Sequence, residues 1–360
     1  MNYKNFSIVG GGIAGLGAAL AVEKAGAAAH VFEKTATFDH VGAGLQLGPN
    51  AVRALQALGA WEAVQPFAFA PPEIHIRSGV TGKILKRIKL GANFEAKFGA
   101  PYRVARRADL HGALLSVAKS KHAISLEMGA EAEIASLSEE GPVIAADGIW
   151  SKIRASLFPA AKVVRLKDVI YRSLNPMPAV AGKVALECVN LWLFPGGHVV
   201  HYPVGQVLRL NLVAVTQGQM PLEHFRAAAF DLQLLLASVE DWTPWPAAHV
   251  SGLDHWSNGN ILLMGDAAHG TVPYLAQGAA MALEDAAALG GLLAQSSDLA
   301  QSFRSFEALR IQRCLSLDRQ SRGNGRLYHL RQPLALARDM ALRWAPASLI
   351  TARQDWIYSS

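Results

Sequence analysis

The chain has 360 residues, of which 51% are apolar and 17% charged, and its formal net charge is +6. This length can bury the core of two associated domains, and the composition excludes a disordered chain. The basic residues are scattered. Their one dense group, Lys83, Lys86, Arg87 and Lys89, has no interleaved aromatic residues on which bases could stack. We therefore expect a solvated strand or loop there and no nucleic-acid binding, while the positive charge favours an anionic substrate such as a carboxylate.

The cysteines and the apolar stretches indicate in which cellular compartment the protein is expected. Cys188 and Cys314 are the only two cysteines and lie far apart, so neither a disulfide framework nor a metal site is expected. The first residues lead directly into a predicted strand and a glycine loop, which argues against a signal peptide. No stretch of about 18 apolar residues predicts a membrane span. These features predict a cytoplasmic protein without a metal.

The first part of the chain predicts a βαβ unit. An apolar strand over residues 6–9, a helix over 13–25 and a strand over 29–32 follow one another. Between the first strand and the helix, Gly10 to Gly15 fits G-x-G-x-x-G, where glycines and a helix start approach a pyrophosphate. Glu33 stands where a carboxylate accepts hydrogen bonds from a ribose, which favours FAD or NAD over a 2′-phosphorylated nucleotide. The predicted cofactor contacts here are Gly10, Gly12, Ile13, Ala14, Gly15, Glu33 and Lys34.

Further along, the pattern alternates between sheet and helix. Residues 71–100 look strand-like, a helix begins near Ala108, and 155–251 again look like strands with one helical segment over 222–239. After an apolar strand over 260–264, the chain is helical from Gly278 onward, with interruptions at Pro333 and Pro346. We expect an α/β protein with a Rossmann-like FAD-binding domain, an inserted mixed β-sheet substrate domain and a helical C-terminus. The boundaries are 1–70, 101–154 and 253–295 for the first domain, 71–100 and 155–252 for the second, and 296–360 for the C-terminal helices.

A second cofactor motif follows the strand over 260–264. The strand runs into a turn at Gly265 and Asp266, and the segment from Gly278 to Ala280 then opens a helix rich in small residues. A carboxylate at a strand end can hold sugar-alcohol hydroxyls, and a helix start offers free N–H groups to a phosphate or a flavin carbonyl.

These residues resemble a known family. GDAAHGTVPYLAQGAAMALEDA is similar to the second FAD motif of class A flavoprotein monooxygenases, in the branch of salicylate, hydroxybenzoate and hydroxynicotinate hydroxylases. Nearly the whole chain shares the resemblance, through GGGIAGL near the start, VGAGLQLGPNAVRAL from Val41, RRADLHGALL from Arg106, ADGIWSKIR from Ala146, HYPV from His201 and DWIY near the end.

The resemblance implies an FAD-dependent monooxygenase that uses NADH or NADPH and dioxygen to hydroxylate a small phenolic acid through a flavin hydroperoxide. It also implies roles for individual residues. Arg107 would reach the FAD phosphate and ribityl region, Asp266 the ribityl hydroxyls, Asp147 with Gly148 both FAD and the passing nicotinamide, Gly44 and Leu45 the flavin ring, and Gly278, Ala279 and Ala280 its pyrimidine edge. Because no second G-x-G-x-x-G is present, the nicotinamide is expected to bind only transiently.

The strand over 198–203 predicts the catalytic face. Its two-residue period places His198, Val200 and Tyr202 on one face and Val199 and His201 on the other. In the related hydroxybenzoate hydroxylases a histidine and a tyrosine at this spacing bind or deprotonate the substrate hydroxyl, and a polar residue at the position of Gln277 assists. A phenolate is more electron-rich than a phenol, so a base that titrates near neutrality suits this chemistry. The alternative for His198 is a core histidine bonded to backbone.

Three other functions stay open at this stage. One is an FAD monooxygenase acting on a non-phenolic substrate, such as an alkene epoxidase. Another is a nicotinamide dehydrogenase, which would not need the Gly265-Asp266 segment, and a third is a non-catalytic flavin redox sensor. The stretch from Met128 to Asp147 is shorter than the strands that the family usually has there, which indicates a trimmed hairpin or missing residues. The choice between monomer and homodimer, the nicotinamide, the phenolic acid and the position attacked are not readable from the sequence.

Overall fold

A parallel sheet forms the first half of the molecule. The computed structural model describes residues 5–37, 43–132, 134–177 and 184–359. The sheet has the strand order β14-β15-β8-β1-β2-β7, and only β14 runs antiparallel to its neighbour. Its strands are β1 (Asn5–Val9), β2 (Ala28–Glu33), β7 (Ile124–Met128), β8 (Val143–Ala145), β14 (Ser257–Asn258) and β15 (Ile261–Leu263). Strands from the start of the chain and from residues 257–263 thus meet in one sheet, as the predicted fold class requires.

Small residues allow the helices to pack closely beside this sheet. Helix α1 (Ile13–Lys24) lies against α11 (Gly278–Gln295) and α5 (Arg107–Lys119). A Cβ atom added at Gly17 would lie 3.0 Å from Ala286 Cβ, and one added at Gly290 would lie 3.1 Å from Ala21 Cβ. The high Gly and Ala content of the sequence therefore sets the separation of α1 and α11. Helices α2 (Pro49–Ala57), α3 (Trp61–Val64) and the 3-10 turn Gln65–Phe67 complete this half.

A mixed sheet forms the second half. Its order is β13-β9-β12-β11-β10-β4-β5, and all neighbours are antiparallel except β10 and β4. The strands are β4 (Glu73–Ser78), β5 (Ile84–Lys89), β9 (Lys162–Pro176), β10 (Val189–Phe194), β11 (Gly197–Val204), β12 (Arg209–Thr216) and β13 (Thr243–Ser251). A two-stranded ribbon of β3 (Gly44–Leu47) and β6 (Arg103–Arg106) lies between the two sheets. The fold class predicted from the sequence is confirmed.

The structure corrects two local predictions. Residues 92–98, read as strand-like, form the helix α4 (Ala92–Phe98), and the helical segment over 222–239 is two short helices, α8 (Pro221–His224) and α9 (Phe230–Ala237). The short stretch before Asp147, for which a trimmed hairpin or missing residues were expected, contains the helix α6 (Ile134–Glu140). Residues 92–98 are too few for their apolar periodicity to distinguish helix from strand. Helix α7 (Lys152–Leu157) follows.

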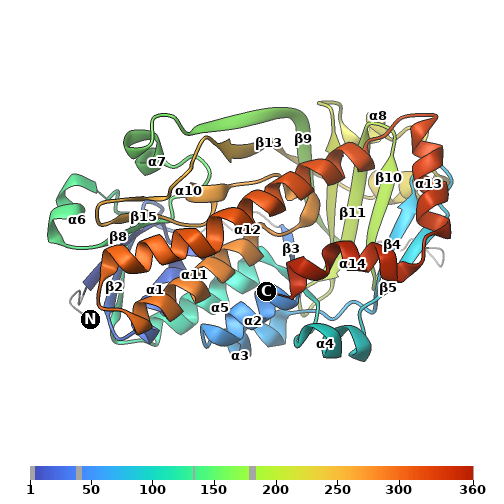
Figure 1. Cartoon of the computed structure of the whole chain (residues 1–360). Coiled ribbons are helices and arrows are strands. Elements are labelled where there is room, and N and C mark those ends of the chain that lie inside the picture. The colour runs from blue at the N-terminus through green and yellow to red at the C-terminus, as the bar shows by residue number, and fades with distance from the viewer. Residues whose placement is uncertain (1–4, 38–42, 133, 178–183, 360) are drawn as a thin grey trace.

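The C-terminal helices join the two halves. Helix α12 (Leu299–Tyr328) runs from the parallel sheet to the mixed sheet, and α13 (Leu334–Trp344) lies beside β5 (Figure 1). Helix α14 (Ala347–Tyr358) then brings the chain end back between the halves, next to α2. Pro333 and Pro346 lie in the breaks between these helices, as predicted.

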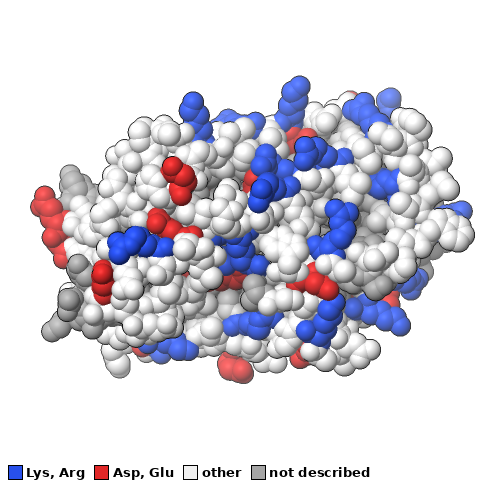
Figure 2. All heavy atoms as spheres, viewed as in Figure 1, with Lys and Arg blue, Asp and Glu red and all other residues white. Residues whose placement is uncertain are grey.

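On the face drawn in Figure 2, Lys and Arg side chains form several separate groups rather than one continuous band. Within the described ranges, every helix is too short or too polar to cross a membrane.

Candidate active site and FAD-binding residues

The glycine loop is shaped for close backbone approach. Gly10 has φ +105°, and a Cβ atom there would collide with the Ala146 carbonyl. A Cβ atom at Gly12 would meet nothing within 4 Å, so the loop is open at the start of α1. Glu33 accepts hydrogen bonds from Gly11 N (2.7 Å), Thr35 N (2.9 Å) and Thr35 Oγ1 (2.8 Å). Burial raises the pKa of Glu33, but these hydrogen bonds outweigh it and lower the pKa overall, so the carboxylate is ionised.

The Gly-Asp turn lies against the glycine loop. Gly265 has φ +61°, and a Cβ atom there would lie 2.6 Å from Ala14 Cβ. Asp266, the first residue of α10 (Asp266–His269), is exposed, yet surrounding protein desolvates its carboxyl group and raises its pKa. His269, followed by the two cations Arg107 and Arg172, opposes that rise. A solvent-accessible carboxylate enclosed by protein, with two cations nearby, indicates the wall of a concave site.

Three further predicted residues lie around the loop. Arg107 begins α5, donates its backbone N–H to Ala43 O (2.7 Å) and has an exposed side chain. Asp147 Oδ2 accepts from Lys152 N (3.0 Å) at the start of α7, while Oδ1 is buried without a partner in the described chain. Lys34 is exposed beside Glu33. Asp147 therefore has both a structural role and a free oxygen.

Gly44 brings the ribbon into contact with the mixed sheet. A Cβ atom there would lie 2.6 Å from Asn211 Cγ and 2.7 Å from Tyr202 Cε2. Gly44 N donates to Asn211 Oδ1 (2.6 Å), and Asn211 Nδ2 is buried without a partner in the described chain. Leu45, the next residue, packs on the main core. Only glycine fits at position 44, which places Tyr202 directly against the ribbon.

Gln277 is tied to a buried polar network. It precedes α11, is 5% exposed, and its Oε1 accepts from Asn50 Nδ2 (2.9 Å). Asn50 also donates to Glu284 Oε1 (2.6 Å). A Cβ atom at Gly278 would meet nothing within 4 Å, so the start of α11, continued by Ala279 and Ala280, is open. Open N–H groups at a helix start suit an anionic or carbonyl oxygen.

His198 and Tyr202 lie on the same face of β11, as the alternation predicts, but in different surroundings. His198 Nδ1 is 2.8 Å from His329 Nε2, and its ring contacts Tyr274 and Tyr328 edge-on. Burial, followed by the neighbouring His329, lowers the pKa of His198 well below its ordinary value. Burial has the opposite effect on Tyr202: it raises the pKa of the phenol, although the nearby Arg172 and a hydrogen bond from Gln46 lower it. Near neutral pH we therefore expect an uncharged imidazole and a protonated phenol.

Several side chains of this site were not found from the sequence. Arg172 lies near Tyr202, and Gln46 contacts both Tyr202 and Tyr102, whose hydroxyl donates to Gln46 Oε1. His329 contacts His198 across 131 residues of sequence. No local motif marks these residues, because only the packing of β3, β9 and α12 around β11 brings them together.

The chain around the glycine loop fits FAD. The loop at Gly12 and the α11 start at Gly278 are open where phosphate and flavin oxygens would approach, while Gly10 and Gly265 allow the loop and the Gly-Asp turn to pack closely on the neighbouring chain. Asp147 Oδ1 and Asn211 Nδ2 are buried polar atoms without partners among the described residues, which a bound ligand would satisfy.

Comparisons with known proteins identify the relatives of this chain. Residues 222–301 match the family model described as an FAD binding domain. The 3-hydroxybenzoate 6-hydroxylase of Polaromonas naphthalenivorans (strain CJ2) is 30% identical, over 98% of this chain and 94% of the relative. Two solved structures have the same fold: Klebsiella pneumoniae HpxO complexed with FAD and uric acid (TM-score 0.86, 21% identity, 99% and 96% coverage) and a salicylate hydroxylase substrate complex (TM-score 0.80, 24% identity, 100% and 96% coverage).

Fold and site together define a flavoprotein with an FAD-binding half and a mixed-sheet half. The chain belongs to the family of class A FAD-dependent aromatic hydroxylases. It is a flavoprotein monooxygenase whose cofactor is FAD, and it acts in aromatic hydroxylation.

Proposed function

We propose that the enzyme hydroxylates a small phenolic acid held between His198 and Tyr202. The buried face of β11 carries this proposal: it presents an uncharged histidine and a protonated tyrosine, both 3% exposed, next to the FAD-binding half. The curated relative described above acts on 3-hydroxybenzoate by its name, which is a substrate of this class.

The spacing of the two side chains separates their roles. Four residues along a strand correspond to roughly 13 Å, and side chains stand about perpendicular to the sheet. His198 and Tyr202 are therefore too far apart to contact the same hydroxyl, but they suit the two polar ends of an aromatic acid. This refines the expectation that both residues act on the substrate hydroxyl.

The protonation states of the two side chains favour His198 for the substrate hydroxyl and Tyr202 for the substrate carboxylate. His198 uses Nδ1 for His329, so Nε2 is left to accept the phenol proton, although the lowered pKa of His198 makes it a weaker base than the near-neutral one expected from the sequence. Tyr202 keeps its proton and can donate to the carboxylate, with Arg172 nearby as a cation. Gln277, held by Asn50 at the start of α11, is the third polar contact. FAD, when bound, supplies the activation of dioxygen with electrons from the nicotinamide.

The residues proposed to hold FAD surround the open loop. They are Gly10, Gly12, Ile13, Ala14, Gly15, Glu33, Lys34, Gly44, Leu45, Arg107, Asp147, Asp266, Gly278, Ala279 and Ala280. We further propose NADH or NADPH as a transient co-substrate with dioxygen, a cytoplasmic location, and a monomer or homodimer. The two cysteines are unpaired and buried, which supports a reducing compartment. We also propose three domains: an FAD-binding domain of residues 1–70, 101–154 and 253–295, a substrate domain of residues 71–100 and 155–252, and C-terminal helices over 296–360.

The first test is the oxidation of NADH and NADPH by the FAD-loaded protein. The reaction is followed with and without salicylate, 3-hydroxybenzoate, 4-hydroxybenzoate and 6-hydroxynicotinate, and the masses of the products are determined by mass spectrometry. We expect one acid to accelerate oxidation and to yield a product one oxygen heavier, or one hydroxylated with loss of its carboxyl group. If none of these acids accelerates oxidation by the FAD-loaded protein, the proposal of a phenolic acid substrate is contradicted.

Variants test the two roles. His198→Ala should lower kcat by about 100-fold or more, because general-base contributions are of that order. Tyr202→Phe should mainly raise KM for the acid, and it should leave KM unchanged for the corresponding phenol without a carboxylate. His122→Ala, an exposed histidine, is the control. Unchanged kinetics in both site variants would contradict the assignment.

A further inference from the structure

The back face of the mixed sheet carries polar side chains that the proposed reaction does not use. Cross-strand pairing aligns His75 with Asn190 and Asn190 with His201, and it aligns Arg77 with Trp192. Because neighbouring residues of a strand point to opposite faces, His201 lies on the opposite face to His198 and Tyr202. This second face is thus separated from the proposed catalytic face by the sheet itself.

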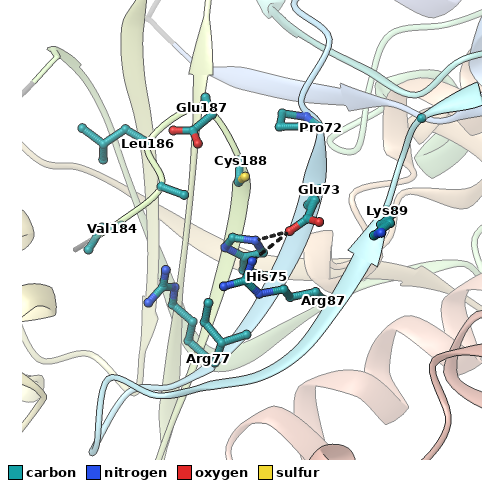
Figure 3. Close-up of a pocket in the computed structure, with 13 residues that line it drawn as sticks. Pro72, Glu73, His75, Arg77, Arg87, Lys89, Val184, Leu186, Glu187 and Cys188 are labelled. Atoms are coloured by element: carbon teal, nitrogen blue, oxygen red, sulfur yellow. Dashed lines mark hydrogen bonds and ion pairs between the residues drawn. The ribbon is translucent and has the colours of Figure 1, made fainter. Parts of the chain in front are cut away.

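A cavity of about 800 Å³ opens on this back face (Figure 3). One wall is formed by side chains of β4 and β5, and the other by residues 184–188, which precede β10. The cationic side chains Arg77, Arg87 and Lys89 line it, and Ile84, Val184 and Leu186 supply apolar surface. Arg87 and Lys89 belong to the dense basic group of the sequence, and no residue of that group is part of the proposed catalytic site.

Arg77 is a buried cation without a carboxylate partner. It is 4% exposed, its Nε donates to Asn190 Oδ1 (2.8 Å), and its Nη1 reaches Gly82 O at 3.3 Å. The guanidinium lies 4.9 Å from the Trp192 ring centre. Across the described ranges, no carboxylate lies within ion-pair distance of it, and Asp231 acts only at longer range. Arg310, equally buried, pairs with both Glu284 and Asp285.

The difference between Arg77, which has no carboxylate partner among the described residues, and Arg310, which has two, indicates that Arg77 is suited to bind an anion. Buried charges in proteins are normally paired, and an unpaired one costs several kcal/mol. Burial lowers the pKa of Arg77, as expected for a guanidinium in this position. A bound anion would supply the counter-charge.

The acidic residues of the cavity do not fill this role. Glu73 is already engaged by His75 Nε2 (2.7 Å) and Arg87 Nη1 (3.6 Å). Glu187 is exposed and lies in the opposite wall (Figure 3). Burial raises the pKa of the Cys188 thiol to about 11, so it carries no charge near neutral pH. His75 Nδ1 is buried without a partner in the described chain, which offers a further polar contact.

We propose that this cavity is a second binding site, for an organic anion with an apolar body, of the aromatic carboxylate class. The carboxylate binds Arg77, with Arg87 and Lys89 at the rim, and the ring lies against Val184 and Leu186. A guanidinium suits a carboxylate because it can donate two parallel hydrogen bonds. The inference does not depend on the proposed reaction, because the site lies on the other face of the sheet.

Benzoate is the probe, since it lacks the hydroxyl group that the proposed catalytic base would deprotonate. Binding to the FAD-loaded protein is measured at low salt by calorimetry, and in parallel by the flavin absorbance spectrum. Binding next to the flavin changes that spectrum, whereas binding on the back face is silent in it. We expect a flavin-silent binding event in the unmodified protein that is weakened at least tenfold in Arg77→Met, while the flavin-detected event is unchanged. Arg304→Met, on the exposed side of α12, is the matched control.

A second variant, at Arg87 on the rim of the cavity, and thermal unfolding ensure that the test does not depend on Arg77→Met alone. Arg87 has a side chain that is 59% exposed, so Arg87→Gln should fold normally and weaken the silent event several-fold. Without benzoate, Arg77→Met removes an unpaired buried charge but also the donor to the buried Asn190 Oδ1, so its thermal unfolding is measured to establish that the variant folds. The proposal is overturned if calorimetry finds no silent event, or if the silent event has the same affinity in Arg87→Gln and in any folded Arg77 variant.

Discussion

At the scale of single residues, the contact between Gly44 and Tyr202 controls how the two halves meet. Gly44→Ala would place a methyl group 2.6 to 2.9 Å from Asn211 and Tyr202, so either the ribbon or β11 must shift. We expect a loss of about 1–3 kcal/mol in stability from overpacking, together with weaker FAD retention. Thermal unfolding and the flavin content of the purified protein measure both effects.

Gly291 provides the control for this substitution. It lies in α11, and a Cβ atom there would meet nothing within 4 Å. Gly291→Ala should be neutral or stabilise the helix by up to about 1 kcal/mol. Equal effects of the two alanine substitutions would show that the close approach at position 44 has no energetic importance.

At the scale of elements, buried ion pairs hold α10, α11 and α12 together. Asp285 of α11 is 2.5 Å from His269 Nε2 and 2.8 Å from Arg310 Nε, and it also accepts from Gly265 N (3.1 Å). His269, which follows the Gly265-Asp266 turn, is thus held by another helix. Asp285→Asn breaks the pair and should cost about 3–5 kcal/mol. Chemical denaturation measures it, with Asp298→Asn at the exposed start of α12 as a milder comparison.

The pH dependence of that loss follows from the two pKa shifts. Burial raises the pKa of Asp285, but His269 and Arg310 lower it below the ordinary 3.8, so its contribution disappears as pH falls through this range. Burial lowers the pKa of His269, but Asp285 raises it above the ordinary 6.5. The contribution of His269 is complete below 6.5 and is lost as pH rises through the folded-state pKa. The difference between Asp285→Asn and the unmodified protein should therefore be largest between these limits, and a difference independent of pH would contradict the ion pair.

At the scale of the whole molecule, the end of the chain closes the boundary between the two halves. Tyr358 is 8% exposed and packs edge-on against Phe94, Phe98 and Tyr102, while Arg53 donates to its carbonyl (2.5 Å). Tyr358→Ala should destabilise the protein by about 3–5 kcal/mol, because a large buried ring is lost. Tyr358→Phe keeps the ring and should have little effect. Thermal unfolding of the two variants checks this, and similar losses in both would show that the hydroxyl matters more than the packing.

The sequence by itself determined the fold class and the cofactor motifs, because these depend on local patterns. Gly10 to Gly15, Glu33 and the Gly265-Asp266 turn are read from spacing and chain order. The face shared by His198 and Tyr202 follows from the two-residue period of a strand. Short segments such as 92–98 were assigned wrongly, since a few apolar residues fit a helix and a strand equally.

Only the tertiary structure decided which side chains surround these motifs. His329 contacts His198, Arg172 lies near Tyr202, and Arg77 is buried without a carboxylate, all through elements distant in sequence. Charge and hydrogen-bond partners across a sheet depend on strand order and register, and here the order β13-β9-β12-β11-β10-β4-β5 does not follow the chain. A sequence pattern shows which face of a strand a residue occupies, but the neighbours that shift its pKa or leave its charge unpaired come from the packing of the whole molecule.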